Sequence, residues 1–210
     1  MTEDLEQRTA DWFAARLGKV TASRISDVVA KTKSGYGASR ANYAAELIAE
    51  RLTGTTADRF TNAAMQWGTD REPDARAAYE FTLDVKVAEV GFIPHPTIEM
   101  SGASPDGHVG EDGLVEIKCP NTATHLETLL GAQIPAKYVL QMQWQMACTG
   151  RLWCDFVSYD PRLPLSMQLH IERLDRDDEV IGELEEAVSR FLDEIELKVK
   201  ELTERYAEAA

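Results

Sequence analysis

Residues 101–120 read SGASPDGHVG EDGLVEIKCP, and the rest of the chain is organised around this stretch. It holds two carboxylates and one ammonium group, on Asp106, Glu116 and Lys118. The flanking apolar residues alternate as they do in strands, and glycines enclose the acidic pair within residues 110–113. Glycines placed in this way are typical of hairpin turns, so we expect a β-hairpin that carries the three charged side chains.

The register of this hairpin determines whether the charged groups meet. Side chains alternate between faces along a strand, so Glu116 and Lys118 share one face. A two-residue loop would put Asp106 on the other face, whereas a three-residue loop over 111–113 puts it opposite Lys118. The longer loop needs a left-handed residue at its third position, and Gly113 supplies one. We therefore predict the three-residue loop, with both carboxylates and the ammonium group on one face.

Two adjacent carboxylates repel each other unless a cation lies between them. Carboxylate oxygens suit Mg²⁺ or Mn²⁺, and a lysine nearby can orient a water, take its proton or stabilise developing negative charge. The alternative is a surface hairpin with a salt bridge between Asp106 and Lys118, which the isolated pattern favours. Ser104-Pro105 before the aspartate and Cys119-Pro120 after the lysine favour a functional site.

Length and charge suggest one domain over residues 1–210 with an uneven charge distribution. The 210 residues are 44% hydrophobic, which is enough for a core, and the net charge is −14. Residues 12–45 have a balance of +5, whereas residues 175–210 have a balance of −8. A basic N-terminal third could focus nucleic acid into one groove. The alternative, which composition alone favours, is that the net charge only keeps the protein soluble.

Several classes of protein are disfavoured by the sequence. No apolar run approaches the roughly 18 residues of a membrane helix, and the polar, acidic N-terminus does not resemble a signal peptide. The three cysteines lack metal-ligand spacing, which favours a reducing cytoplasm and disfavours zinc and iron–sulfur sites. A phosphate-binding loop of the GxxxxGK[ST] type is also missing from the sequence.

Hydrophobic periodicity outlines the other elements. A long amphipathic helix is expected over 178–206, packing on the core, with an oligomer contact at its last turns as the alternative. Residues 31–42 combine glycine, serine and lysine with one tyrosine, which suits either a connector or a segment that binds a single-stranded end. We expect further helices at 8–18, from 21 onwards, at 42–53, at 61–82 with a break at Gly68, at 122–131 and at 137–148, and strands at 84–100, 152–159 and 168–173.

The motif Ser104-Pro105-Asp106-Gly107, followed by LVEIKCP at 114–120, resembles the core of the phage lambda exonuclease family. These proteins, also called YqaJ-like viral recombinases, belong to the (D/E)-x-K nuclease superfamily. Matching motifs follow one another in the family's order from about residue 8 to about residue 195. Each motif is weak alone, but five of them in this order are specific for the family. The other four are Trp12…Arg16…Thr21-Ala22-Ser23, Trp67-Gly68…Glu72…Ala75-Arg76…Tyr79-Glu80-Phe81, Gln141-Met142-Gln143 and Tyr159-Asp160-Pro161-Arg162.

The resemblance implies an α/β fold with a restriction-endonuclease-like core, in which helices flank a short mixed sheet with a central hairpin. It implies a Mg²⁺-dependent 5′-to-3′ exonuclease on linear double-stranded DNA that leaves 3′ overhangs for phage-type homologous recombination. It also implies a homotrimer, a single-strand annealing protein as partner, no membrane, and the cytoplasm of a bacterial host with a phage or prophage gene. The alternatives are an endonuclease or single-strand trimming nuclease on the same core, and a catalytically silent protein that binds DNA ends.

On the same resemblance, Asp106 and Glu116 hold one or two Mg²⁺ ions, with Mn²⁺ as a substitute. The backbone carbonyl of Ile117 is a further ligand, and Lys118 positions or deprotonates the attacking water.

Two more residues complete this site by resemblance, namely Glu72 and Gln141. From the residues alone, Glu72 stands in the first turn of a helix that begins near Asp70, where a carboxylate compensates the helix dipole. Gln141 shares a helix face with Tyr138, and an exposed polar stripe would explain both.

A phosphate site is expected where two helices meet near Arg16 and Ser23. Free N–H groups at a helix N-terminus, an arginine and a serine can bind a phosphate together. The residues alone favour an ordinary cap, made by Thr21 or Ser23, and a surface arginine. The resemblance implies instead that Arg16 and Ser23, with Ser104 and Gln141, bind the terminal 5′-phosphate of the digested strand.

Overall fold

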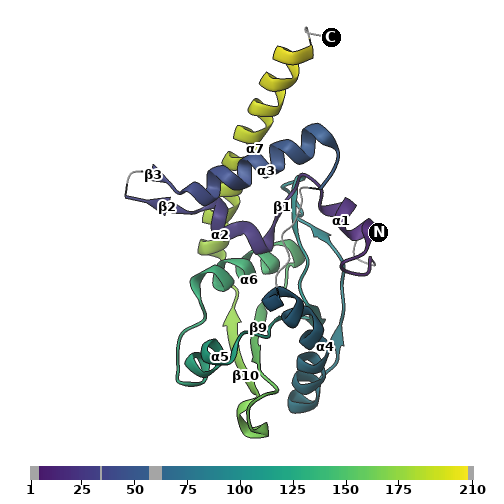
Figure 1. The fold of residues 1–210 in the computed structure, drawn as a ribbon, viewed down its shortest axis with the longest axis vertical. Coiled ribbons are helices and arrows are strands. Elements are labelled where there is room, and N and C mark those ends of the chain that lie inside the picture. Colours follow the sequence, from purple (N-terminus) through teal and green to yellow (C-terminus); the bar gives the residue numbers. More distant parts are fainter. Residues whose placement is uncertain (1–4, 34, 57–62, 208–210) are drawn as a thin grey trace.

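The computed structural model describes residues 5–33, 35–56 and 63–207 (Figure 1). Residue 34 of the predicted 31–42 loop and residues 61–62 of the predicted 61–82 helix lie outside the described residues. That the whole chain, 1–210, forms one domain therefore stays a prediction.

The main sheet has five strands in the order β10-β9-β8-β7-β4. Its members are β4 (Val87–Ala88), β7 (Gly107–Val109), β8 (Gly113–Lys118), β9 (Trp153–Tyr159) and β10 (Leu169–Asp175). β8 and β9 run parallel, and the other neighbours are antiparallel. β8 is covered on both faces, which agrees with its nearly continuous apolar sequence.

The β7–β8 hairpin forms as expected, but its predicted register was wrong by two residues. Val109 pairs with Gly113, so the three-residue loop spans 110–112 rather than 111–113. The left-handed residue of this loop is Gly110, with φ of 56°. Gly113 is required for another reason, because a Cβ there would lie 2.1 Å from the ring of Trp153. Two glycines in one turn therefore serve different constraints, and the sequence alone did not distinguish them.

The error of two residues leaves every side chain on its predicted face, because the strand period is two. Gly107 pairs with Val115, so continuing the same register brings Asp106 opposite Glu116 rather than Lys118. The predicted gathering of charged groups on one face of the hairpin is therefore confirmed.

Two helices cover the two faces of this sheet. α4 (Ala63–Leu83) packs through Ala75 and Tyr79 against the face that presents Val115. α6 (Ala136–Thr149) packs through Met142 and Met146 against the opposite face, which presents Leu114. Because Glu116 shares its face with Leu114, the strand period directs this carboxylate toward α6.

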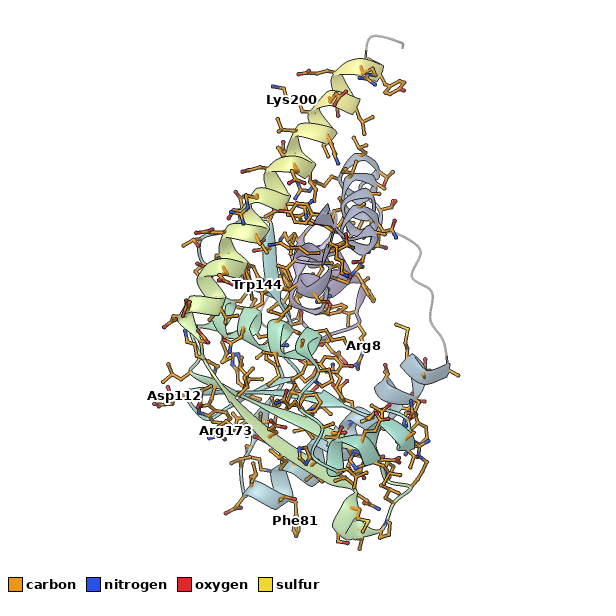
Figure 2. All side chains as sticks on the ribbon, turned by 90° about the vertical axis from the view of Figure 1, so that its left-hand side faces the viewer. Arg8, Phe81, Asp112, Trp144, Arg173 and Lys200 are labelled. Atoms are coloured by element: carbon orange, nitrogen blue, oxygen red, sulfur yellow. The ribbon has the colours of Figure 1, made fainter. Side chains whose placement is uncertain are left out.

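α6 also faces a second core, built with α2 (Ile25–Val28), α3 (Ala38–Thr53) and α7 (Asp178–Ala207). Figure 2 shows Trp144, which is completely buried, where α7 crosses α6. The predicted apolar stripe of α7 is buried from Ile181 to Ile195, and the last turns extend beyond the rest of the body, as seen near Lys200 (Figures 1 and 2).

Smaller elements bring the N-terminal segment beside the hairpin. β1 (Val20–Thr21) pairs in parallel with β6 (Ser101–Ala103), which leads directly into Ser104. No helix in the described part of the chain is long and apolar enough to cross a membrane. The remaining elements are α1 (Ala10–Arg16), η2 (Ala22–Arg24), β2 (Lys31–Thr32), β3 (Gly35–Tyr36), β5 (Ile93–Pro94), α5 (Thr122–Leu129) and η3 (Leu165–Met167).

Two further element predictions were wrong. The expected strand over 84–100 is reduced to the two-residue strands β4 and β5, since Pro94 and Pro96 cannot donate to a ladder. The expected 31–42 loop contains the short β2–β3 hairpin, and α3 already begins at Ala38.

The predicted helix break at Gly68 was also wrong, because α4 runs without interruption through Gly68 and Pro73. Burial of Ala75 and Tyr79 against the sheet holds the helix together despite two poor helix formers. Glu72 therefore lies in the middle of a helix, and compensation of an N-terminal dipole does not explain it.

A glycine-to-alanine pair tests this continuity. A Cβ on Gly68 would meet nothing within 4 Å, and the same holds for Gly182 in the undisputed helix α7. Both Gly68→Ala and Gly182→Ala should raise the free energy of unfolding by about 0.5–1 kcal/mol, because alanine loses less backbone entropy in a helix. Urea denaturation of the two variants measures this. A gain for Gly182→Ala together with a loss for Gly68→Ala would contradict a continuous α4.

Candidate functional site

The site is built on the β7–β8 hairpin at its junction with α6. Asp106 stands just before β7, and its carboxylate accepts a hydrogen bond of 2.6 Å from the backbone N–H of Ile117. Glu116 is only 1% exposed, whereas the side chain of Lys118 is 28% exposed. The two carboxylates and the lysine thus meet where the covered interior of the sheet opens to solvent.

Glu116 has a different set of partners for each carboxylate oxygen. Its Oε1 accepts a 2.7 Å hydrogen bond from Gln141 and forms an ion pair with the Nζ of Lys118. Its Oε2 accepts a 2.6 Å hydrogen bond from Gln145. The sequence reasoning found Gln141 but missed Gln145, although the spacing of four residues places both amides on one face of α6.

The electrostatics of the hairpin fit a bound cation. Burial, and then the negative charge of Glu116, raise the pKa of Asp106 well above its ordinary value. Burial disfavours the charged form of Lys118, but the carboxylates of Glu116 and Asp106 outweigh it and raise the pKa of the ammonium group. Two carboxylates with one ammonium group leave a negative charge in excess, which a divalent cation would neutralise.

The donor set fits Mg²⁺ in number as well. In the part of the chain that the structure describes, no group of three or more His, Cys, Asp or Glu side chains forms a metal cluster. Mg²⁺ does not need such a cage, because it keeps several waters and commonly uses one or two carboxylates. Asp106 and Glu116 meet that requirement, and Ile117 lines the same space.

An open cleft of about 690 Å³ lies above these groups. It brings together six of the predicted site residues, from η2, α4, the turn before β7, β8 and α6. Glu116 is not part of this lining but contacts it through Lys118 and Gln141. Arg8, Lys137 and Tyr138 also line it, and none of them was predicted as a site residue. The cleft is lined by Arg8, Ser23, Ala64, Met65, Gly68, Thr69, Glu72, Asp106, Ile117, Lys118, Cys119, Pro120, Lys137, Tyr138 and Gln141.

Glu72 reaches the cleft from α4, but its carboxylate is already bound to arginines. It forms ion pairs with Arg8 at 2.5 Å and with Arg76 at 2.9 Å. Its negative charge contributes to the raised pKa of Asp106, which places it within electrostatic range of the hairpin. Glu72 is therefore an electrostatic neighbour of Asp106, and its part in the site stays a prediction.

The predicted phosphate site is divided in the structure. Arg16 is 8% exposed, stacks on the ring of Trp12 at 4.0 Å, and donates a 3.0 Å hydrogen bond to the Oγ of Ser104. Ser23 is exposed in the cleft, and Gln141 is bonded to Glu116.

The helix cap expected near Ser23 is also different from the prediction. Thr21 occupies the N-cap position of the 3-10 turn η2, but its side chain does not cap it, and α2 has only four residues. The helix N-terminus therefore contributes less to anion binding here than the sequence suggested.

The segregation of charge along the sequence is not maintained in space. Arg24, in the basic third, pairs with Asp27 at 2.6 Å and Glu46 at 2.9 Å. Arg40 forms a two-fold hydrogen-bonded pair with Glu194 of the acidic C-terminal third. The excess positive charge predicted for residues 12–45 is therefore partly neutralised within the fold.

Other motifs converge beside the cleft. Arg162 binds the Asp160 carboxylate at 2.7 Å, donates to the carbonyl of Pro120 at 3.2 Å, and lies over the ring of Trp67 at 4.5 Å. Burial alone would raise the pKa of Asp160, but the hydrogen bonds from Arg162 lower it to about 2. This ion pair connects the ends of β8 and β9 to the start of α4, so it supports the walls of the cleft.

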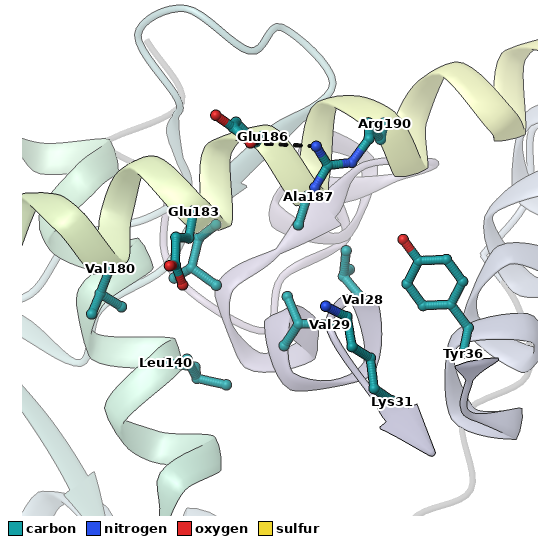
Figure 3. A pocket seen from close by; sticks show the side chains of 11 residues that line it. Val28, Val29, Lys31, Tyr36, Leu140, Val180, Glu183, Glu186, Ala187 and Arg190 are labelled. Carbon is teal, nitrogen blue, oxygen red and sulfur yellow. Dashed lines mark hydrogen bonds and ion pairs between the residues drawn. The ribbon is translucent and has the colours of Figure 1, made fainter. Parts of the chain in front are cut away.

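A second hollow of about 330 Å³ lies between α2, the β2–β3 hairpin, α6 and α7 (Figure 3). Val28, Val180 and Leu140 form part of its lining, and Glu186 and Arg190 at its rim pair with each other at 3.3 Å. Lys31 and Tyr36 of the 31–42 segment line it, but none of the residues expected to hold the metal or the terminal phosphate does.

Comparison with known proteins identifies the family and the fold. Residues 11–152 match the family described as the YqaJ-like viral recombinase domain. The crystal structure of an alkaline exonuclease, LHK-Exo, from Laribacter hongkongensis is 57% identical in sequence and has a TM-score of 0.90, covering 96% of this chain and 100% of that chain. LHK-Exo in complex with dAMP matches with the same values.

A phage related exonuclease from Haemophilus somnus 129PT, at 17% identity and a TM-score of 0.67, covers 88% of this chain and 96% of that chain, and shares the fold. No match was found among curated proteins. The mixed α/β fold predicted from the sequence is thus the fold of phage-type exonucleases.

The raised pKa of Asp106 predicts a stability effect of Asp106→Asn. A carboxyl group whose pKa is raised on folding destabilises the fold once it ionises, so the stability of the metal-free wild type falls as pH rises from the ordinary pKa of 3.8 through the raised value. Asn keeps an acceptor for the Ile117 N–H but has no charge. In EDTA, Asp106→Asn should melt at a higher temperature than wild type at neutral pH, and the difference should vanish in acid. A lower melting temperature at neutral pH would mean that repulsion between the carboxylates is not significant.

Proposed function

Because the chain belongs to the YqaJ-like viral recombinase family, we propose that it is a Mg²⁺-dependent exonuclease that degrades linear double-stranded DNA. The observation that carries the proposal is that Asp106 and Lys118 line an open cleft, and that the buried carboxylate of Glu116 binds Lys118 and Gln141 of the same lining. The alkaline exonuclease activity named for the 57% identical relative supports the same reaction class.

In this proposal, Asp106 and Glu116 hold the metal, with the main-chain carbonyl of Ile117 as a further donor. Bound there, Mg²⁺ supplies Lewis-acid chemistry, since it polarises a phosphate oxygen and neutralises developing charge. The carboxylates bind and orient it, and their mutual repulsion is relieved at the same time. The walls of the cleft limit the directions from which a phosphodiester can approach.

Lys118 is suited to donating hydrogen bonds from a charged ammonium group rather than to accepting a proton. The neighbouring carboxylates raise the pKa of Lys118, so its ammonium group is charged and can orient a water or stabilise negative charge on the phosphate. In hydrolysis the water oxygen forms a bond to phosphorus while the bond from phosphorus to the leaving oxygen breaks. In the metal-free protein, the charged state of Lys118 agrees better with orientation of the water than with deprotonation, the two roles expected for this residue.

The finer features of the reaction are part of the same proposal. We expect digestion from 5′ to 3′, with 3′ overhangs that pass to a single-strand annealing protein, and a homotrimer around the duplex. We also expect the protein to work in the cytoplasm of a bacterial host, encoded by a phage or prophage. The proximity of Arg16 to Ser104, two residues before Asp106, supports recognition of a strand end next to the hairpin. The complex of the relative with dAMP is consistent with a mononucleotide as product.

A digestion assay tests the proposed reaction. The wild type should degrade linear duplex DNA with Mg²⁺, should be inactive in EDTA, and should leave a closed circle intact. Lys118→Ala should lower the single-turnover rate by roughly 10²-fold while retaining metal and DNA binding, because a group that stabilises the transition state is lost. Lys137→Ala is the matched control: it removes a charge from the same cleft and should alter the apparent DNA affinity far more than the maximal rate.

Two results would refute the assignment. Cleavage of the closed circle would identify an endonuclease. Substantial Mg²⁺-dependent digestion by Asp106→Ala or Glu116→Ala would show that these carboxylates are not the metal ligands.

The end specificity can be tested at Arg16. Wild type should digest a 5′-phosphorylated duplex faster than a 5′-hydroxyl duplex, because a guanidinium group makes paired, charge-assisted hydrogen bonds to phosphate. Arg16→Ala should reduce the ratio of the two initial rates toward one, and Arg16→Lys should restore it only in part because it lacks the planar fork. Arg24→Ala is the control, since this arginine is engaged by Asp27 and Glu46. A preserved ratio in folded Arg16→Ala would show that another group reads the phosphate.

A further inference from the structure

α6 carries three glutamines at alternate positions, and each of them has a separate task. Gln141 lines the cleft and donates to Oε1 of Glu116. Gln143 points away from this carboxylate, donating to the carbonyl of Asp175 at 2.9 Å and accepting from the N–H of Asp177 at 3.0 Å. Gln145 donates to Oε2 of Glu116 and is completely buried. Of the three, only Gln145 both contacts a proposed metal ligand and is excluded from solvent.

The orientation of the Gln145 amide follows from chemistry. An ionised carboxylate accepts hydrogen bonds and cannot donate, so the NH₂ group of Gln145 must face Glu116. The amide oxygen then faces the Sγ of Cys154 at 3.9 Å, the length of a weak thiol hydrogen bond. Burial raises the pKa of Cys154 well above its ordinary value, so the thiol keeps the proton that it donates. Both ends of the amide are thereby occupied, and its orientation is defined.

The two oxygens of Glu116 are consequently not equivalent. Oε1 is held from the cleft side, by the ammonium group of the partly exposed Lys118 and by the cleft-lining amide of Gln141. Oε2 is held from the interior, by a residue with no exposure to solvent. A cation that enters through the cleft meets Oε1 and can displace the ammonium group there, whereas access to Oε2 would require removal of a buried hydrogen bond.

We propose that Gln145 is a positioning residue that fixes Oε2 of Glu116 and thereby makes Oε1 the single oxygen through which this carboxylate binds the divalent cation. This inference rests on the proposed metal site and identifies what orients one of its ligands. Because Gln145 is buried, it has no access to DNA, and its influence on the reaction passes through Glu116. Groups that orient metal ligands in this way commonly change metal affinity or activity by about 10–100-fold when they are replaced.

The test compares cation binding by Gln145→Met, Gln143→Met and wild type without DNA. Isothermal titration with Mn²⁺ should give an affinity about tenfold weaker for Gln145→Met, because the methionine fills the space but donates no hydrogen bond to Oε2. Gln143→Met removes an equally buried amide from the same helix and should bind Mn²⁺ as wild type does, whatever it does to stability. In digestion assays, Gln145→Met should need more Mg²⁺ for half-maximal rate, with a smaller change in the rate at saturation.

A second variant keeps the test valid if methionine is not tolerated at this buried position. Gln145→Asn retains an amide but is one methylene shorter, so it should weaken Mn²⁺ binding in the same direction. Wild-type affinity in either folded Gln145 variant, or an equal loss in Gln143→Met, would overturn the role of Gln145.

Glu116→Ala separates this inference from the proposed function. If Glu116→Ala loses Mn²⁺ binding while the Gln145 variants keep it, the metal site stands and the positioning role fails. If Glu116→Ala binds Mn²⁺ like wild type, the cation lies elsewhere and both proposals fail.

Discussion

The repulsion between the carboxylates of Asp106 and Glu116 is the constraint on which the rest of the site depends. Two negative charges in a largely covered position are unfavourable, and the surrounding fold compensates for them. Lys118 contributes an ion pair, two glutamines of α6 donate to Glu116, and the backbone N–H of Ile117 donates to Asp106. These groups hold the carboxylates in place, and two negative charges remain against one ammonium group, which is the arrangement on which the proposed cation site rests.

α6 has a central position because it belongs to two cores at once. One side of the helix packs through Met142 and Met146 on the sheet, and the other packs through Trp144 against the core that includes α7. A helix fixed on both sides can hold two glutamine amides within hydrogen-bond distance of a buried carboxylate. The rigidity of the site therefore comes from hydrophobic packing that does not itself take part in the chemistry.

Ion pairs within the fold bring oppositely charged parts of this chain, which has a net charge of −14, into contact. Arg40 of the basic N-terminal segment pairs with Glu194 of the acidic C-terminal helix. The positive charge of Arg40 therefore serves to hold the two segments together. The cations that line the cleft are Arg8, Lys118 and Lys137. Arg8 is paired with Glu72 and Lys118 with Glu116, so most of the positive charge beside the cleft is already bound to carboxylates of the same chain.

The sequence by itself determined the features that arise from short periods. The strand period of two placed Glu116 and Lys118 on one face, and the periods of three and four produced α7. Only the tertiary structure decided the hairpin register, the pairing of Glu72 with Arg8, and the contact of Gln145 with Glu116. Local alternation is determined by adjacent residues, whereas the contacts of Glu72 and Gln145 join segments far apart in the chain, and Gly113 of the hairpin packs on Trp153 of another strand. These contacts depend on how the two cores position the helices against the sheet, and no local sequence pattern encodes that arrangement.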